Sequence, residues 1–316
     1  MTSYLITRLA TTSLVFFIIS ITIFASIHLL PGNVVVMVAG EYATREQIEI
    51  LTEKLGLNRP FLVQYYEWIS KFVRGDLGES LIMKQQIFPI LMRRLGRSLM
   101  LAAVAAIGVL LLGVGAGIIS GVRKGSLLDS FVAVSTYIGM ATPEFVSGTL
   151  LILVLGGAWF GSRILPSSGY VEFSEGFVPW LRHLILPSIT IMIVILAYIM
   201  RMTRISIIET MKKDYIRTAR LKGLSEWTVI FKHTLKNAMI PTVTLLGSNL
   251  PWLVGGIVIT ENVFAYPGIG RLVTYAITNR DLPLVQASAL TIASLTLIGN
   301  FMADLSYHWL NPKVRE

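Results

Sequence analysis

The sequence contains no cysteine and few charged residues, and both absences limit what the chain can be. Without cysteine it can form no disulfide, thiolate metal site or thiol nucleophile. Only 14% of its 316 residues are charged and 54% are hydrophobic, whereas soluble domains carry roughly 25% charged residues. A water-soluble fold of this size cannot hide so much apolar surface, so we expect the chain to reside in a lipid bilayer.

The motifs of several enzyme classes are also missing. The sequence has no Gly-Lys dipeptide, and therefore no phosphate-binding loop that ends in Gly-Lys-Ser/Thr. It has no His-Glu-x-x-His, no Gly-x-Ser-x-Gly and no pair of aspartates within the apolar runs. Its four histidines are scattered without metal-ligand spacing. We therefore expect no catalytic residue, no metal site and no cofactor bound by this chain, and any ATP energy must come from partner chains.

Long runs without Asp, Glu, Lys or Arg predict an all-α, polytopic membrane protein with six spans, since a membrane helix needs roughly 20 apolar residues. The predicted spans are 9–30, 98–122, 127–160, 183–200, 238–260 and 282–309. The first run is longer than the apolar part of a signal peptide and lacks an Ala-x-Ala cleavage site, which indicates a retained anchor. Pro143 and Glu144 interrupt the third.

The basic residues predict the orientation of these spans. With six spans, the short segments on one side hold 14 Lys and Arg, and the opposite loops 161–182 and 261–281 hold four. The positive-inside rule then places both termini in the cytoplasm. The net charge of +9 has the same explanation, so we expect no nucleic-acid partner. The predicted organisation is an anchor span (1–32), an extracytoplasmic helical region (33–97), a core of five spans (98–310) and a cytoplasmic tail (311–316).

Two segments are too long to be simple connections. The outer one, 33–97, has the pattern of amphipathic helices and many aromatic residues, which suits either a cap packed on the span ends or a docking surface for an external partner. The inner one, 201–236, predicts a cytoplasmic helix–turn–helix. Asp214 is expected to cap a helix at 215–222, Gly223 to close it in the left-handed conformation, and Ser225 to cap a second helix at 226–236.

At this inner segment the sequence resembles the permease subunits of the dipeptide/oligopeptide/nickel family of ABC importers. An ordered series of motifs across nearly the whole chain carries the resemblance: LLPG at 29–32, LGLNRP at 55–60, GDLG at 75–78, DYIRTARLKG at 214–223, HTLKNAMIP at 233–241, ENVF at 261–264 and YPGIGR at 266–271. The segment departs from the general Glu-Ala-Ala loop of importer permeases, because Arg217-Thr218-Ala219 stands in its place.

The resemblance implies the type I importer permease (MetI-like) fold in a bacterial inner membrane. It also implies a second homologous permease, two cytoplasmic ATPase subunits that bind ATP and Mg, and an extracytoplasmic substrate-binding protein. The implied substrates are dipeptides or short oligopeptides, with nickel chelates, opines, glutathione or other peptide-like solutes as alternatives. A secondary transporter or channel is the rival class, but such a protein would carry ion-coupling charges in mid-membrane, and only Glu144 qualifies.

The resemblance further implies that the inner helix–turn–helix couples the spans to the ATPases. Ala219 would permit close approach to a groove, and Gly223 would permit a sharp reversal of the chain. The cations would either pair with acidic groups on the ATPase rim or simply reflect the positive-inside bias. The expected coupling residues are Asp214, Tyr215, Arg217, Thr218, Ala219, Arg220, Lys222 and Gly223.

A second candidate site lies within the spans. A carboxylate inside a span marks a possible passage, so Glu144 either lines the translocation path or reaches water where Pro143 breaks the helix. Pro251 and Gly255 are expected to kink a pore-lining helix. By contrast, Gly113, Gly117 and Gly121 form a small-residue stripe that predicts close helix packing.

Overall fold

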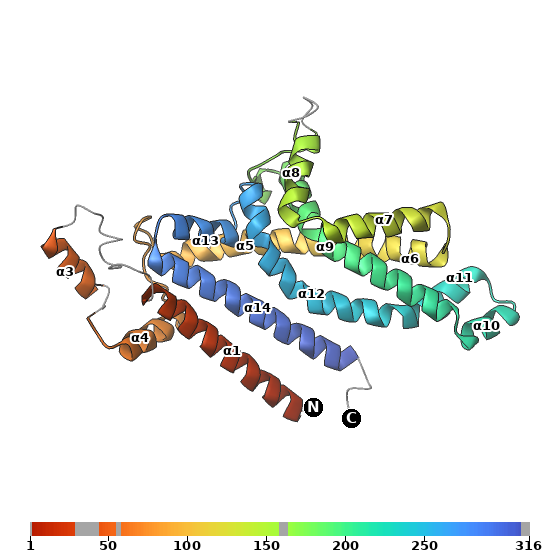
Figure 1. Ribbon diagram of the computed structural model, residues 1–316, viewed down its shortest axis with the longest axis horizontal. Coiled ribbons are helices and arrows are strands. Elements are labelled where there is room, and N and C mark those ends of the chain that lie inside the picture. Colours follow the sequence, from red (N-terminus) through yellow and green to blue (C-terminus); the bar gives the residue numbers. More distant parts are fainter. Residues whose placement is uncertain (1, 29–43, 55–57, 158–163, 311–316) are drawn as a thin grey trace. The chain divides into compact units, whose positions relative to one another are not determined.

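All regular structure in the described part of the chain is helical, apart from one isolated bridge between Glu79 and Gln86. The computed structural model describes residues 2–28, 44–54, 58–157 and 164–310 (Figure 1). The α-helices are α1 (Thr2–His28), α3 (Arg45–Lys54), α4 (Phe61–Val73), α5 (Ile87–Gly108), α6 (Gly115–Val122), α7 (Leu127–Ala141), α8 (Glu144–Leu155), α9 (Phe177–Met211), α10 (Asp214–Leu221), α11 (Glu226–Thr228), α12 (Leu235–Val263), α13 (Ile269–Thr278) and α14 (Leu282–Leu310). The predicted all-α class is confirmed.

Short segments of other helix types join some of these helices. A π-helical segment, Val109–Val114, links α5 to α6, and another, Val229–Thr234, links α11 to α12. A 3-10 turn, Phe173–Glu175, precedes α9. The chain as a whole divides into two compact units, Met1–Ser98 with Pro267–Ile298 and Leu99–Tyr266 with Gly299–Glu316.

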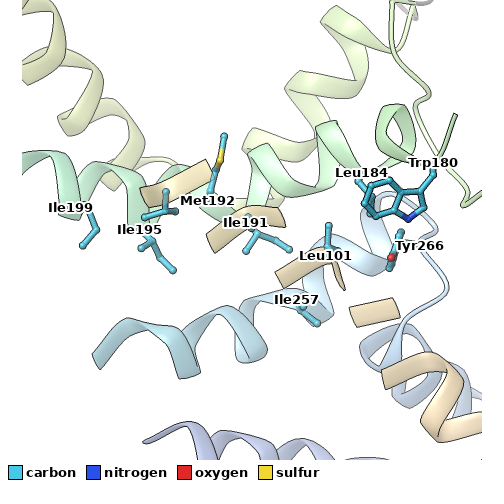
Figure 2. Close-up of a cluster of buried hydrophobic side chains, with 11 residues drawn as sticks. Leu101, Trp180, Leu184, Ile191, Met192, Ile195, Ile199, Ile257 and Tyr266 are labelled. Atoms are coloured by element: carbon cyan, nitrogen blue, oxygen red, sulfur yellow. The ribbon is translucent and has the colours of Figure 1, made fainter. Parts of the chain in front are cut away.

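The second unit is organised around α9, which packs against α6, α7, α8 and α12. Its apolar core joins Leu101 of α5, Ile191 and Ile195 of α9, Ile257 of α12 and the ring of Tyr266, all of them buried (Figure 2). Because α9 contacts helices on several sides, 56% of its most apolar stretch is buried, against 11% for α1. It is therefore the central helix of this unit.

The glycine stripe brings α6 close to α9, as predicted. A Cβ atom on Gly117 would lie 2.6 Å from Cβ of Thr203 and 2.9 Å from the carbonyl oxygen of Met200. One on Gly121 would lie 2.7 Å from Cβ of Ile207. These distances are too short for any side chain, so the glycines are what allow the two backbones to approach.

The first unit has its own core, formed by α5, α13 and α14 and containing Leu91, Leu272 and Leu284. Directly before α14, the fully buried carboxylate of Asp281 accepts hydrogen bonds from the Ser80 hydroxyl and from the backbone N–H groups of Leu81 (3.2 Å) and Ile82 (3.3 Å). A single aspartate therefore ties the turn at 79–86 to the start of the last helix, 200 residues further along the chain.

Helix α4, in the outer segment, packs on the anchor helix α1. Phe24 of α1 contacts the rings of Tyr65 and Trp68 at centroid distances of 5.6 and 5.4 Å. The Tyr65 hydroxyl also lies 2.7 Å from the hydroxyl of Ser20. The opposite face of α4 stays exposed, with Leu62 at 75% and Tyr66 at 70%. The aromatic residues of this segment are thus partly a packing surface and partly free for a partner.

Among the described residues, length and composition identify four helices that can cross a membrane, and up to five spans if the bent pair α7–α8 counts as one. The predicted span at 238–260 lies within α12, which is helical over 29 residues but is not among those four. The count of six therefore stays a prediction. Pro31-Gly32, expected to end the first helix, lies outside the described residues.

The structure corrects two boundaries, each because a helix continues through residues that seemed too polar or irregular for it. Helix α5 begins at Ile87, so Arg93, Arg94 and Arg97 lie inside a helix and not in the loop before a span. Helix α9 runs over 35 residues from Phe177 to Met211, with Pro187 in its interior. The third predicted span is interrupted at Pro143 and Glu144, as expected, with a bend of 114° between α7 and α8.

Candidate functional site

The predicted helix–turn–helix is present as α10, the turn 222–225 and α11, and we call residues 214–228 the helix–turn–helix element. Gly223 closes α10 with φ +75°, and the Ser225 side chain accepts from the N–H of Thr228 to cap α11. Both features are as predicted. Asp214 is not the N-cap, because Lys213 takes that position and Asp214 lies in the first turn, where its charge suits the helix dipole.

The element is attached at both ends to long helices. Helix α9 ends at Met211, so Lys212 and Lys213 alone separate it from α10. After α11 the helix does not stop at Lys236 as predicted. It continues through the π-helical segment into α12 and ends at Val263. The element is therefore joined to α9 through two residues and to α12 through continuous helix.

A small apolar cluster holds the element together. Ile216 and Ala219 of α10 pack with Val229, and their exposed fractions are 0, 6 and 0%. The Arg220 guanidinium also donates to the Glu226 carboxylate at 2.8 and 3.3 Å, across the turn. Ala219, expected to face a groove of a partner, instead faces its own chain, where its small side chain lets the two helices close on each other.

The outer surface of the element is apolar and basic. Leu221, Trp227 and Phe231 are 80, 72 and 54% exposed, and the rings of Trp227 and Phe231 stack at 4.5 Å. Arg217 and Lys222 are exposed, and neither forms an ion pair within the part of the chain that the structure describes. Sequence reasoning selected the cations but missed the aromatic pair, which the i, i+4 spacing of two large rings on a polar helix would have indicated.

The second candidate site lies where α7 and α8 meet. Thr142 is extended, as the residue before a proline tends to be, and Pro143 is the N-cap of α8. The break predicted at Pro143 is thus confirmed. Glu144 occupies the first turn of α8, is only 9% exposed, and accepts a hydrogen bond from the Thr260 hydroxyl of α12.

Pro251 and Gly255 lie in α12, the same helix as Thr260, nine and five residues before it. Helix α12 is continuous through both, so the backbone is not broken there. The structure joins Glu144 to α12 through Thr260 and does not describe the surroundings of Pro251 and Gly255.

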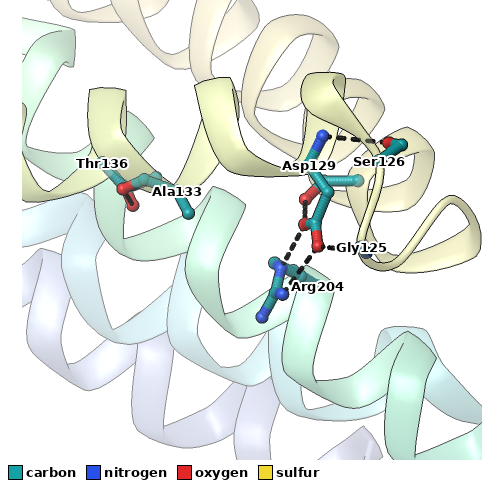
Figure 3. A network of polar contacts seen from close by, with 7 residues as sticks. Gly125, Ser126, Asp129, Ala133, Thr136 and Arg204 are labelled. Atoms are coloured by element: carbon teal, nitrogen blue, oxygen red, sulfur yellow. Dashed lines mark hydrogen bonds and ion pairs between the residues drawn. The ribbon is translucent and has the colours of Figure 1, made fainter.

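A third polar group, which no sequence pattern indicated, is centred on Asp129 of α7. Its carboxylate accepts from Nε and Nη2 of Arg204 (2.6 and 2.9 Å), from the Ser120 hydroxyl (2.5 Å) and from the N–H of Gly125 (2.9 Å), as Figure 3 shows. The Asp129 side chain is 6% exposed. The cluster joins α6, α7 and α9 at one end of the second unit.

Comparisons with known proteins agree along the whole chain. The family described as "Binding-protein-dependent transport system inner membrane component" matches residues 113–316, and "Binding-prot-dependent transport system membrane comp, N-term" matches residues 1–102. A probable peptide ABC transporter permease of Sinorhizobium fredii is 37% identical over 312 residues, 99% of each chain. A putative peptide transport system permease of Brucella abortus is 35% identical over 317 residues, 100% of this chain and 99% of its own length.

One further relative and one solved structure extend the comparison. A glutathione transport system permease of Escherichia coli is 34% identical over 317 residues, 100% of this chain and 99% of its own length. A crystal structure of an amino acid ABC transporter with histidines superposes with a TM-score of 0.52 at 17% identity, over 70% of this chain and 94% of that one. This last likeness shows the fold alone, and it is the ABC permease fold that was expected.

Proposed function

This chain belongs to the family of binding-protein-dependent transport system inner membrane components, and from that membership we propose that it is the translocation subunit of an ATP-driven importer of dipeptides or short oligopeptides. The family is one of membrane transport components, not of enzymes. The peptide substrate is supported by the printed names of the Sinorhizobium and Brucella relatives, which match over essentially their whole length.

The observation that carries the proposal is the helix–turn–helix element. It has its own apolar cluster, yet Leu221, Trp227 and Phe231 are exposed. The exposed Arg217 and Lys222 form no ion pair in the described part of the chain. Exposed apolar patches with a charged rim mark protein–protein contacts, and Trp is prominent among residues that dominate binding energy. We assign this surface to an ATPase subunit. Arg217 and Lys222 would meet acidic groups on its rim, and Gly223 and Asp214 would fix the shape of the helix that is presented.

The remaining partners and the orientation follow from the same proposal. The element faces the cytoplasm together with both termini, as the distribution of basic residues predicts. Two ATPase subunits bind ATP and Mg, this chain binds neither, and a second homologous permease completes the passage. A substrate-binding protein delivers the peptide on the outer side, where the exposed face of α4 is a candidate contact.

Coupling then works by rigid connection. When ATP closes the ATPase pair, the element moves with it, and α9 and α12 are pulled because they continue directly into it. The inward-open and outward-open states must differ in their contacts with ATP or substrate, since a ligand that contacts both equally shifts nothing. We place Pro143, Glu144, Pro251 and Gly255 along the passage, because the break at Pro143 and the buried carboxylate lie at a helix junction.

Glutathione is a second candidate substrate. It is itself a small peptide, and the Escherichia coli relative named for its transport is 34% identical over the full chain. The two candidates separate in an uptake assay with labelled dipeptide, tripeptide and glutathione, in cells whose other importers of these solutes have been deleted.

The test of the proposal is co-purification. Extraction of the full-length chain from its native membrane in mild detergent should bring a second permease and ATPase subunits in stoichiometric amounts. The double change Trp227→Ala with Phe231→Ala should reduce the recovered ATPase at least tenfold and abolish uptake. Tyr66→Ala, which removes an equally exposed ring from α4 (70%), should leave the ATPase bound.

The opposite result is equally clear. If the chain purifies alone or as a homo-oligomer, and the Trp227 and Phe231 variants transport as well as the unaltered chain, the coupling assignment is wrong. A secondary transporter or channel then becomes the better reading.

A further inference from the structure

A small pocket opens between α7 and α9, apart from both candidate sites. Its volume is about 150 Å³, and its lining includes Thr136 and Tyr137 of α7 and Met200, Arg201 and Arg204 of α9. Two guanidinium groups, a phenol ring and a hydroxyl-bearing side chain border the same small space. The proposed transport cycle assigns no role to any of them.

The charges around the pocket leave one positive charge uncompensated. Arg204 directs Nε and Nη2 to the carboxylate of Asp129, so this pair is neutral overall (Figure 3). Arg201 is exposed, and its guanidinium carbon lies 5.7 Å from the centre of the Tyr137 ring. Among the described residues no carboxylate pairs with Arg201. The pocket therefore presents a single free cation, held in place by an aromatic face.

The level of the pocket within the bilayer follows from the sequence of α9. Residues 183–200 contain no Asp, Glu, Lys or Arg, and Arg201 is the first charge after them. At 1.5 Å per residue this stretch is roughly 27 Å long, close to the ~30 Å of a bilayer's hydrocarbon core. Arg201 thus stands at one boundary of the apolar layer, the level at which lipid phosphates lie.

The surface beside the pocket is apolar. On α7, Phe131, Val134 and Ile138 are 72, 57 and 62% exposed. A soluble anion gains nothing from such a surface, whereas acyl chains would lie along it. The combination of a basic pocket between membrane helices and a neighbouring apolar face is that of a headgroup site.

We propose that the pocket between α7 and α9 binds the phosphate of an anionic phospholipid, with Arg201 as its principal partner. A guanidinium presents its N–H donors in a fork that matches phosphate oxygens. One net negative charge on the lipid balances the one free cation, so a headgroup with a single phosphodiester, such as phosphatidylglycerol, fits best. The free N–H groups of Arg204 and the hydroxyl of Tyr137 supply further donors at the rim. The proposal is independent of which solute the protein transports.

The test measures lipid binding directly. The full-length chain, in the assembly that mild detergent extracts, is delipidated and titrated with phosphatidylglycerol while native mass spectrometry counts the bound lipids. Arg201→Gln should weaken the tightest binding step about tenfold, because it removes a charge-assisted contact. Arg201→Lys keeps the charge but loses the forked N–H donors, so its affinity should lie between those of Arg201→Gln and the unaltered chain. Both variants leave the Asp129–Arg204 pair intact, and the melting temperature of each in detergent checks that it is folded.

Matched controls separate this site from general charge effects. Lys124→Gln removes one exposed cation from the turn before α7, outside the pocket, and should leave the affinity unchanged. Phosphatidylcholine has the same phosphodiester without net charge and should bind at least tenfold more weakly. Inorganic phosphate at millimolar concentration should not displace the lipid.

Three results would overturn the proposal. One is equal phosphatidylglycerol affinity in Arg201→Gln and the unaltered chain. Another is displacement by inorganic phosphate, which would make this a site for a soluble anion. The third comes from Tyr137→p-benzoylphenylalanine in the native membrane. Crosslinking to lipid supports the site, whereas crosslinking to another protein chain shows that a subunit covers it.

Discussion

Thr260 of α12 donates its hydroxyl to the carboxylate of Glu144, the first residue of α8. Both residues are buried, with exposed fractions of 0 and 9%. The carboxylate also lies at a helix N-terminus, where the unpaired N–H groups favour negative charge. This contact explains how a charged residue is accommodated at a break between two apolar helices.

Thr260→Val should therefore destabilise the protein. The change keeps the shape of the side chain but leaves the buried carboxylate without that donor, which costs about 1–3 kcal/mol. Glu144→Gln retains an acceptor oxygen for Thr260 and should cost less. Thermal unfolding in detergent of the two variants gives the order of these losses. A larger loss in Glu144→Gln than in Thr260→Val would contradict the argument.

The Asp129–Arg204 pair should respond unequally to loss of its two members. Arg204→Met leaves a carboxylate that is 6% exposed with only Ser120 and Gly125 as donors, and we expect a loss of about 3 kcal/mol. Asp129→Asn leaves Arg204, which is 27% exposed, free to turn its guanidinium toward water, and should cost about 1–2 kcal/mol. The unfolding temperatures of the two variants show which change costs more stability. A larger effect of Asp129→Asn would contradict the burial argument.

Two glycines on the same helix should behave in opposite ways. Gly117→Ala places a methyl group 2.6 Å from Cβ of Thr203 and 2.9 Å from a backbone oxygen, so α6 and α9 must separate, at about 1–3 kcal/mol. Gly115→Ala meets nothing within 4 Å and should be neutral or stabilising by up to ~1 kcal/mol, since alanine favours helix. The yield of folded protein and its melting temperature report both. Equal tolerance would mean that this contact is not tight.

Gly223 should tolerate asparagine better than alanine or valine. Its φ of +75° is the reason, because no atom lies within 4 Å of the position a Cβ would take. A left-handed backbone costs an ordinary residue about 1–2 kcal/mol, and asparagine less. Recovered ATPase and peptide uptake should fall in the order Gly, Asn, Ala, Val. If the three variants transport as well as the unaltered chain, the turn is not needed for coupling.

Local signals account for what the sequence predicted well. Ser225 caps α11 by accepting from an N–H group three residues away, and Gly223 turns the chain through its own backbone. Pro143 breaks a helix at its own position. Each acts within a turn or two and needs no knowledge of the rest of the fold. Apolar runs are also local evidence, because each helix in a bilayer must satisfy its backbone hydrogen bonds within itself.

Helix ends were predicted less well for the same reason. A charge after an apolar run indicates the border of the membrane, but it does not stop a helix, because Arg, Lys and Glu are good helix formers. Helix α9 therefore passes Arg201 and ends at Met211, and the helix that contains Lys236 continues to Val263. The part of a helix that crosses the apolar layer and the full length of that helix are separate quantities, and the apolar pattern reports only the first.

The sequence by itself determined that this is a helical membrane protein, that one polar segment forms a helix–turn–helix, and to which family the chain belongs. The tertiary structure decided which distant groups meet: Arg204 with Asp129, 75 residues away, Thr260 with Glu144, 116 away, and Asp281 with Ser80, 201 away. It also decided that Ala219 faces inward while Trp227 and Phe231 face out. Such contacts depend on how separate helices pack, because a buried polar group needs a partner that only the packed neighbour supplies.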